Sequence, residues 1–388
     1  MYRVKTFNKI SPIGLSRLDP ELYTASDAVT DEDAILVRSA KLLDYDFPKA
    51  LLAIARAGAG VNNIPLDRCS EAGIVVFNTP GANANAVKEL VLCAMLMGSR
   101  DVDGGIQWVR QQVAAGVDVT TVVEKGKAAF IGPELYRKTL GVIGLGAIGS
   151  LVANIALSMG MDVYGYDPFL SVDAALRLDR HIHVVKDINE LYKRADYITI
   201  HIHYTKETEH MIDAKAISAM KRGVRFINLA RGEIVDDDAM LAALDTGRVA
   251  AYITDFPNNR LVGAPHVIAM PHLGASTPES EQNCAVMAVD ELRDYLENGN
   301  IRNSVNMPAA SLERSGVMRM CIIHKNIPAM LASITTLLSK DGVNVENLSN
   351  KSKGDYAYTM VDLGTRVDQS VIEDVRKLAN VIRVRVIE

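Results

Sequence analysis

Short runs of β-branched residues alternate with amphipathic helical stretches through most of this 388-residue chain. The candidate buried strands are 140–143, 162–166, 197–202, 224–229, 251–254 and 267–270. Helical sequence separates each of these strands from the next. Strands that alternate with helices form a parallel sheet with crossover helices, so the pattern predicts a doubly wound α/β fold.

The composition narrows the functions that such a fold could serve. The 42 basic and 47 acidic residues leave a formal charge of −5, and no basic tail is present, so we expect no nucleic-acid partner. No apolar run approaches the ~18 residues of a membrane span, and the N-terminus lacks a signal-peptide core. The four cysteines are scattered and form no CxxC pair, which predicts reduced thiols and no metal site. We therefore expect a cytoplasmic protein without membrane contact.

The segment 140–149 is a strand that leads into a G-x-G-x-x-G turn and then a helix. Gly144 allows the tight turn, Gly146 lets the backbone approach a pyrophosphate, and Gly149 lets the helix pack closely on the strand. The first helical residues, Ala147 and Ile148, offer free N–H groups and a partial positive charge to phosphates. The turn therefore predicts a dinucleotide site.

An acidic residue ends the next strand, Val163–Tyr166. Asp167 lies 18 residues after Gly149, close to the spacing of about 20 at which a carboxylate accepts the ribose hydroxyls. A carboxylate there also repels a 2′-phosphate, so the cofactor predicted is NAD rather than NADP. The alternative role for Asp167 is to cap the turn before Pro168.

Two side chains suited to hydride transfer follow buried strands. Arg231 comes directly after 226–230, and His272 comes directly after 267–271. An arginine fork binds a carboxylate through two parallel hydrogen bonds, and a histidine exchanges protons near neutral pH. Ligands of open α/β sheets bind outside the carboxyl ends of the strands, so we expect both side chains to serve one site.

The pattern changes after an Asn- and Gly-rich stretch, 297–308, which reads as a linker. The elements that follow are a strand, a helix, two strands, a helix and a strand, at 317–324, 327–340, 343–348, 356–363, 370–378 and 381–387. This βαββαβ order predicts a separate C-terminal module with a ferredoxin-like fold.

Three motifs, 228–232, 271–277 and 144–149, resemble the signatures of D-isomer-specific 2-hydroxyacid dehydrogenases. The likeness continues through 37–39, 56–63 and 78–83, and covers almost the whole chain. It implies a discontinuous, flavodoxin-like substrate-binding domain over 1–95 and 276–305, a Rossmann-type NAD-binding domain over 96–275, and an ACT regulatory or oligomerisation domain over 315–388. It further implies a homodimer or homotetramer.

The resemblance also implies an activity. The expected reaction is NAD-dependent oxidation of 3-phospho-D-glycerate to 3-phosphooxypyruvate, the first step of L-serine biosynthesis, with a small phosphorylated hydroxy acid as substrate. Two alternatives remain open. One is another D-2-hydroxyacid dehydrogenase, for example one that reduces 2-oxoglutarate, and the other is a non-catalytic NAD-sensing protein.

Residue roles carried over by motif make Arg231 the group that binds the substrate carboxylate and His272 the acid/base. The remaining substrate-binding candidates are Arg38, Ser39, Arg56, Gly58 and Lys127, the last reaching a neighbouring subunit. The remaining cofactor-binding candidates are Thr208, Ala230, Asp255 and Gly274, with Asp255 at the nicotinamide amide.

One position departs from the family pattern D-V-F-x-x-E, whose Glu pairs with the catalytic histidine. The corresponding stretch here runs from Asp255 to Arg260, and Arg260 stands at the Glu position. Because a neighbouring carboxylate favours the imidazolium, its loss predicts a displaced pH optimum for reduction. Asn259, water or another segment are the candidate replacements.

The C-terminal module resembles the start of an ACT domain over 322–334. The resemblance implies L-serine as an effector, held by His324, Asn326 and Asn344 at a seam between two copies. Ala329 stands where the family usually has Gly, which narrows the expected pocket. A module that serves only for oligomerisation is the alternative.

Overall fold

The computed structural model describes residues 1–340 and 342–388. The chain divides into two compact units: unit 1 comprises Met1–Asn83 and Pro278–Glu388, and unit 2 comprises Ala84–Thr277. Helix α3 (Ala84–Ser99) belongs wholly to unit 2, whereas the sequence expectation placed 84–95 with the N-terminal segment. The buried apolar residues of α3 join the core of unit 2, which explains this placement. The domain roles expected for these parts remain predictions.

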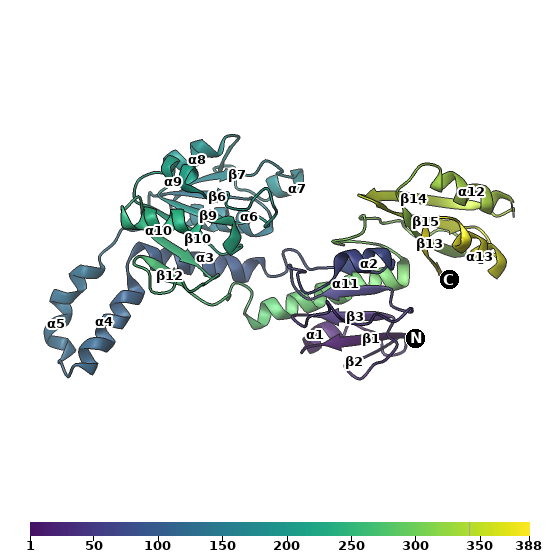
Figure 1. Cartoon of the computed structure of the whole chain (residues 1–388), viewed down its shortest axis with the longest axis horizontal. Coiled ribbons are helices and arrows are strands. Elements are labelled where there is room, and N and C mark those ends of the chain that lie inside the picture. Colours follow the sequence, from purple (N-terminus) through teal and green to yellow (C-terminus); the bar gives the residue numbers. More distant parts are fainter. Residues whose placement is uncertain (341) are drawn as a thin grey trace. The chain divides into compact units, whose positions relative to one another are not determined.

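Unit 2 is built on a parallel sheet of seven strands. The strands are β6 (Thr139–Ile143), β7 (Asp162–Tyr166), β8 (His183–Val185), β9 (Tyr197–Ile200), β10 (Val224–Asn228), β11 (Val249–Thr254) and β12 (Val267–Ala269). Their order is β12-β11-β10-β9-β6-β7-β8 (Figure 1). The order runs outward in both directions from β6 and β9, which makes the carboxyl ends of these strands the switch point where ligands bind. The Rossmann-type prediction is confirmed.

Helices cover both faces of this sheet. They are α3, α6 (Ala147–Ser158), α8 (Ile188–Arg194), α9 (Ala214–Ala219) and α10 (Asp237–Asp245). Unit 2 also contains α7 (Val172–Ala175), which has no buried residue, and a 3-10 turn η2 (Gly232–Ile234). The apolar sides of α3 and α6 pack into one core, and those of α8, α9 and α10 pack into another. Strands enclosed on both faces are predominantly apolar, which is why β6 and β9 read as short runs rich in β-branched residues.

An arm extends from unit 2 (Figure 1). It consists of α4 (Val102–Ala114), α5 (Val119–Gly126) and the 3-10 turn η1 (Lys127–Phe130). No residue of these three elements is buried, and the ring centroids of Trp108 and Phe130 lie 6.0 Å apart across the arm. None of the described helices is both long and apolar enough to cross a bilayer.

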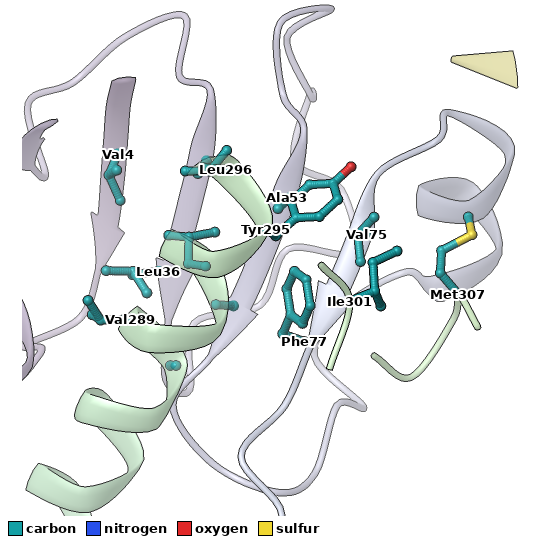
Figure 2. Packing of buried hydrophobic residues seen from close by; sticks show 14 of the residues in the cluster. Val4, Leu36, Ala53, Val75, Phe77, Val289, Tyr295, Leu296, Ile301 and Met307 are labelled. Atoms are coloured by element: carbon teal, nitrogen blue, oxygen red, sulfur yellow. The ribbon is translucent and has the colours of Figure 1, made fainter. Parts of the chain in front are cut away.

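Unit 1 contains a parallel sheet of five strands. The strands are β1 (Tyr2–Phe7), β2 (Tyr23–Ser26), β3 (Ala34–Val37), β4 (Ala53–Arg56) and β5 (Val75–Phe77), and the helices beside them are α1 (Pro12–Leu15), α2 (Leu66–Glu71) and α11 (Pro278–Asn298). The strand order β2-β1-β3-β4-β5 confirms the flavodoxin-like prediction. Helix α11 buries a stripe that includes Val289 and Leu296 against this sheet (Figure 2).

The C-terminal module, 315–388, has an antiparallel sheet of four strands. Its elements are β13 (Met318–Lys325), α12 (Met330–Lys340), β14 (Val345–Lys353), β15 (Tyr356–Leu363), α13 (Gln369–Lys377) and β16 (Val381–Ile387). The strand order β14-β15-β13-β16 confirms the ferredoxin-like prediction. Strand β14 extends past the expected 343–348 because it pairs with β15 along its whole length.

Strand β13 of this C-terminal sheet is buried on both faces. Alternate residues of β13, such as Met320 and Ile322, pack under α12 and α13. The intervening residues Cys321 and Ile323 belong instead to the core that contains α11 and the five-stranded sheet. The side-chain period of a strand is two, so one strand supplies both cores.

The segment expected to be a linker takes part in the same shared core. Ile301 is 1 % exposed and Met307 is 0 % exposed, and both belong to the core that includes residues of α11 and β5 (Figure 2). Asn306 donates hydrogen bonds to Ser70 Oγ (3.1 Å) and to the Ile74 carbonyl oxygen (2.9 Å). The Asn and Gly residues therefore mark turns of a docked segment rather than a free tether.

An ion pair with no solvent exposure joins the module to α11. Arg319 Nε lies 2.6 Å from Asp362 Oδ1, and both side chains are 0 % exposed. Arg319 Nη1 also donates to the Asn298 carbonyl oxygen at the end of α11 (2.7 Å), and Nη2 donates to the Glu313 carbonyl oxygen (3.1 Å). These bonds satisfy one of the carbonyls that a helix end leaves without an internal partner.

Glu291, on the buried side of α11, makes the stability of unit 1 depend on pH. Burial raises the pKa of Glu291 to about 8, although Asn303 Nδ2 donates to its Oε1 (2.6 Å). The folded state therefore holds a proton that the unfolded chain loses above pH ~4.3, so stability is greatest below that pH and falls until about pH 8.

We expect Glu291→Gln to remove this dependence and to stabilise the protein at pH 8 by a few kcal/mol, on the order of 1.4 kcal/mol per unit of pKa shift. Urea unfolding at pH 5 and pH 8 measures it. Glu279→Gln, an exposed position on the same helix, is the control, and equal pH slopes for wild type and Glu291→Gln would refute the prediction.

Candidate active site

The glycine-rich turn has the shape that a pyrophosphate requires. Gly144 adopts φ +88°, and a Cβ there would lie 2.5 Å from the His201 carbonyl oxygen. A Cβ on Gly149 would lie 1.8 Å from the Gly144 carbonyl oxygen, which leaves no room for any other residue. A Cβ on Gly146 would meet open space, so this stretch of backbone is accessible.

The N-terminus of α6 lies at this open position. Gly146 is its N-cap and supplies no side chain, so the first N–H groups, which include those of Ala147 and Ile148, receive no side-chain cap. Unpaired N–H groups and the helix dipole attract anions. The turn and the helix thus fit the phosphates of a dinucleotide.

Asp167 lies at the carboxyl end of β7, beside the turn. Its Oδ2 accepts a hydrogen bond from the Leu145 backbone N–H (2.9 Å), and its Oδ1 accepts one from the Phe169 N–H (2.9 Å). The carboxylate therefore does cap the turn before Pro168, and these bonds also hold it against the glycine loop. Each oxygen keeps acceptor capacity for a ribose hydroxyl.

Arg231 and His272 both lie beside Phe256, which comes shortly after β11. The Arg231 guanidinium carbon is 5.7 Å from the centre of the Phe256 ring. The Phe256 and His272 ring centres are 4.6 Å apart, with the ring planes inclined by 49°. Three segments, which follow β10, β11 and β12, therefore place a cation and an imidazole on one aromatic side chain.

Asp255 is a buried carboxylate in the same place. It is 1 % exposed, its Oδ2 accepts a long hydrogen bond from the Gly274 N–H (3.4 Å), and its Oδ1 has no hydrogen-bond partner among the described residues. Burial raises the pKa of Asp255 above its ordinary value, and the charges of His272 and Arg231 oppose this rise. An unpaired buried acceptor is costly, which fits an acceptor reserved for a donor on a ligand such as an amide.

The residue at the family's Glu position turns to another partner. The Arg260 guanidinium pairs with Asp238, at the start of α10. Within unit 2, no carboxylate of the described residues forms an ion pair with His272. Arg260 and His272 both line a cavity of about 530 Å³, together with Asp255 and Phe256.

Three of the substrate candidates meet in unit 1, at the carboxyl ends of β3 and β4. Arg56 Nε donates to the Arg38 carbonyl oxygen (3.0 Å), and a Cβ on Gly58 would lie 2.2 Å from Arg56 Nη1. Gly58 adopts φ +147°, a backbone conformation that L side chains rarely adopt. The Arg38 guanidinium is paired with Glu281 (2.6 Å). Ser39 follows directly, and its N–H donates to Asn8 Oδ1 (2.9 Å).

The remaining candidates are more dispersed. Thr208 lies in the loop after β9, and its Oγ1 accepts a hydrogen bond from the Thr205 N–H (2.7 Å). Ala230 precedes Arg231, and its carbonyl oxygen accepts a hydrogen bond from Arg231 Nη1 (2.6 Å). Lys127 is the first residue of η1, directly after α5 of the arm, and pairs with Glu124. Its predicted contact with a second subunit remains a prediction.

The three effector candidates do not meet within one chain. His324 is 3 % exposed, and its ring nitrogens contact Thr359 Oγ1 (2.9 Å) and the Lys325 carbonyl oxygen (2.8 Å). Asn326 follows β13 and donates to the Gly354 carbonyl oxygen (3.0 Å).

Asn344 lies at the other end of the sheet, because its neighbour Val345 pairs with Leu363, which pairs with Met318 at the start of β13. About 20 Å of strand therefore separates Asn344 from His324. An effector could meet all three side chains only across two copies of the module.

Phe256 was missed at the sequence level. No spacing rule distinguishes it, because its contacts come from residues that follow two other strands. The one available signal is its position directly after Asp255 and after a buried strand.

Comparison with known proteins places this geometry in context. Residues 92–274 match the family model described as D-isomer specific 2-hydroxyacid dehydrogenase, NAD binding domain. The chain is 33 % identical over 330 residues to D-3-phosphoglycerate dehydrogenase of Methanocaldococcus jannaschii. This alignment covers 82 % of the present chain and 59 % of that protein. The chain is 31 % identical to the protein of the same name from Haemophilus influenzae, covering 93 % of this chain and 88 % of that one.

A solved structure agrees with this likeness. NAD+-bound 3-phosphoglycerate dehydrogenase from Entamoeba histolytica superposes with a TM-score of 0.61 at 27 % identity, covering 79 % of this chain and 98 % of that one. The present chain spans between half and three-fifths of the length of several curated relatives that it matches.

Proposed function

The chain belongs to the family of D-isomer-specific 2-hydroxyacid dehydrogenases, and from this premise we propose that it oxidises 3-phospho-D-glycerate to 3-phosphooxypyruvate with NAD. This reaction is the first step of L-serine biosynthesis. The observation that carries the proposal is the meeting of Arg231 and His272 at Phe256, at the carboxyl ends of β10, β11 and β12. The proposed setting is the cytoplasm, where scattered free thiols such as these stay reduced.

The proposed oxidation requires the chain to bind the cofactor, to bind the substrate carboxylate and to accept a proton. Bound NAD would supply the hydride acceptor, held by the glycine turn, the N-terminus of α6 and Asp167. Arg231 pairs with the substrate carboxylate, for which its planar fork is suited. His272 takes the proton of the 2-hydroxyl group through an imidazole nitrogen, and returns it in the reverse reaction.

In this proposal Arg38 and Arg56 bind the phosphate group of the substrate, at the end remote from its carboxylate. They lie together at the strand ends of unit 1, beside the tight turn at Gly58. The substrate carries more negative charge than a simple hydroxy acid, and the chain itself is acidic, so local cations must concentrate it.

The proposal is tested by mixing the purified protein with NAD and either 3-phosphoglycerate or D-2-hydroxyglutarate and following NADH absorbance. We expect turnover with the phosphorylated acid. Turnover with D-2-hydroxyglutarate alone would reassign the substrate. No turnover with either acid, together with measurable NAD binding, would favour the non-catalytic alternative.

The choice of cofactor can be tested at Asp167. Asp167→Asn keeps one oxygen, which can accept one of the two loop N–H bonds, and removes the charge that repels a 2′-phosphate. We expect the preference for NAD over NADP to fall by roughly tenfold or more, since a few ångströms separate the charges. The measurement is kcat/KM with each cofactor. Asp173→Asn, on the nearby helix α7, is the control, and an unchanged ratio in Asp167→Asn would contradict the prediction.

We propose that the arm forms a homodimer contact. Val102, Ile106, Val109 and Val113 recur at helical spacing on α4 and are 37–61 % exposed. Exposed apolar stripes of this kind mark association surfaces. Val109→Lys with Val113→Lys should reduce the assembly size in analytical ultracentrifugation, and an unchanged mass would refute the arm contact. Lys127, on the same arm, would then reach the partner's substrate.

The regulatory part of the proposal is that L-serine binds between two C-terminal modules. It is supported by the opposite placement of His324 and Asn344, since only a second copy could bring them to one ligand. Titration of activity against L-serine tests it. A flat response would leave the module with an assembly role only.

A further inference from the structure

We propose that Phe256 is a positioning residue, which holds the Arg231 guanidinium and the His272 imidazole in their relative places on its aromatic ring. The proposal rests on the function proposed above, because it assumes that these two side chains act on one substrate. It adds a residue to which neither the motifs nor the family pattern gave a role.

The contacts are of the kind that fix geometry. An aromatic ring attracts a guanidinium within about 6 Å of its centre, and Arg231 lies at 5.7 Å. Inclined ring pairs with centres 4.5–7 Å apart are likewise favourable, and the Phe256–His272 pair lies at 4.6 Å with an angle of 49°. One side chain with two torsion angles therefore contacts both the longer arginine and the exposed histidine.

Phe256 is itself held in place. Its N–H donates to Thr254 Oγ1 (3.1 Å), and the preceding residue, Asp255, is 1 % exposed. A Cβ on Gly232 would lie 3.4 Å from the Phe256 Cβ, so the loop that carries Arg231 lies directly against it. The ring is thus anchored to the end of β11 and to the segment after β10.

His272 has a particular need for such a partner. His272 is exposed. At the position where the family has a Glu that pairs with this histidine, the chain has Arg260, and Arg260 pairs with Asp238. A catalytic imidazole is normally oriented by a group that its ring contacts, and a misplacement of about 1 Å can cost two orders of magnitude in rate. In unit 2 the ring of Phe256 contacts this imidazole, and the buried Asp255 carboxylate acts on it through its charge.

The kinetic test compares Phe256→Leu, which removes the ring, with Phe256→Tyr, which keeps it. We expect Phe256→Leu to lower kcat by roughly 10- to 100-fold, with KM for NAD unchanged because the glycine turn is intact. Phe256→Tyr should retain most of the activity. Phe7→Leu is the matched control, since Phe7 is also partly buried and pairs with an aromatic ring, that of Tyr45, in unit 1.

A spectroscopic readout separates this proposal from the function. In protein with labelled histidine rings, His272 gives the signal that disappears in His272→Ala. The Phe256 ring current should displace that signal, so it should move in Phe256→Leu and stay in place in Phe256→Tyr. The comparison needs no turnover, so a protein inactive with both acids would refute the proposed function while the contact is still judged by NMR.

Two results would overturn the positioning role. One is an unmoved His272 signal in Phe256→Leu, which would show that the rings are not in contact in solution. The other is equal loss of kcat in Phe256→Leu and Phe256→Tyr, which would show that the ring is not what matters at this position.

Discussion

Replacing His272 with alanine should lower kcat for the proposed oxidation of 3-phosphoglycerate by about 10²- to 10⁴-fold, the range that a positioned general base contributes. The expected loss falls on kcat, because the proposed carboxylate partner Arg231 and the glycine turn remain. Steady-state kinetics with NAD and the hydroxy acid, together with fluorescence titration of NAD binding, measure both parts.

His181→Ala is the matched control for that variant. His181 also belongs to unit 2 and is exposed, and its Nδ1 lies 2.8 Å from Asp179 Oδ1 rather than beside any residue of the site. It should leave kcat unchanged. Full activity in His272→Ala would remove the histidine from the mechanism, and loss of NAD binding in that variant would show that the substitution damages the fold instead.

The second large effect is expected on stability, at the buried pair of Arg319 and Asp362. Burial alone would raise the pKa of Asp362, but hydrogen bonds from Arg319 and Ser315 outweigh it and hold the pKa below its ordinary value. Asp362→Leu leaves the guanidinium buried without its counter-charge, which should cost about 3–5 kcal/mol in the free energy of unfolding. Urea denaturation at pH 7 measures it.

Two further variants show whether that loss comes from the unpaired charge. Arg319→Met combined with Asp362→Leu removes both charges and should recover much of the stability, because a buried pair contributes less than the cost of breaking it. Glu373→Ala breaks the exposed pair with Arg376 and should cost under about 1 kcal/mol. A loss in Asp362→Leu as small as that in Glu373→Ala would refute the prediction.

The order and type of the main elements followed from the sequence because the strands are enclosed by helices. Enclosed strands are apolar on both faces, so 140–143 and 224–229 stand out even without knowledge of their neighbours. The turn at Gly144 could be located for a related reason, since Gly144 and Gly149 are each required by a close local contact, whereas Gly146 keeps the backbone open.

The sequence was less informative where long-range packing decides. The stretch around Ile301 and Met307 is short and rich in Asn and Gly, and local chemistry cannot show that these two apolar side chains fill a core. The separation of Asn344 from His324 follows from strand pairing, and the contacts of Phe256 follow from three loops at once. A motif identifies residues one at a time, whereas a site depends on which strand ends are neighbours.

The double burial of β13 has a consequence for how such a chain could be shortened. Cys321 and Ile323 fill space that α11 and Ile301 would otherwise expose to water. Deleting the C-terminal strands would therefore leave a truncated protein with a newly exposed apolar surface, and such a protein would tend to aggregate. A natural or engineered variant without these last residues would first need polar side chains at the positions that they cover.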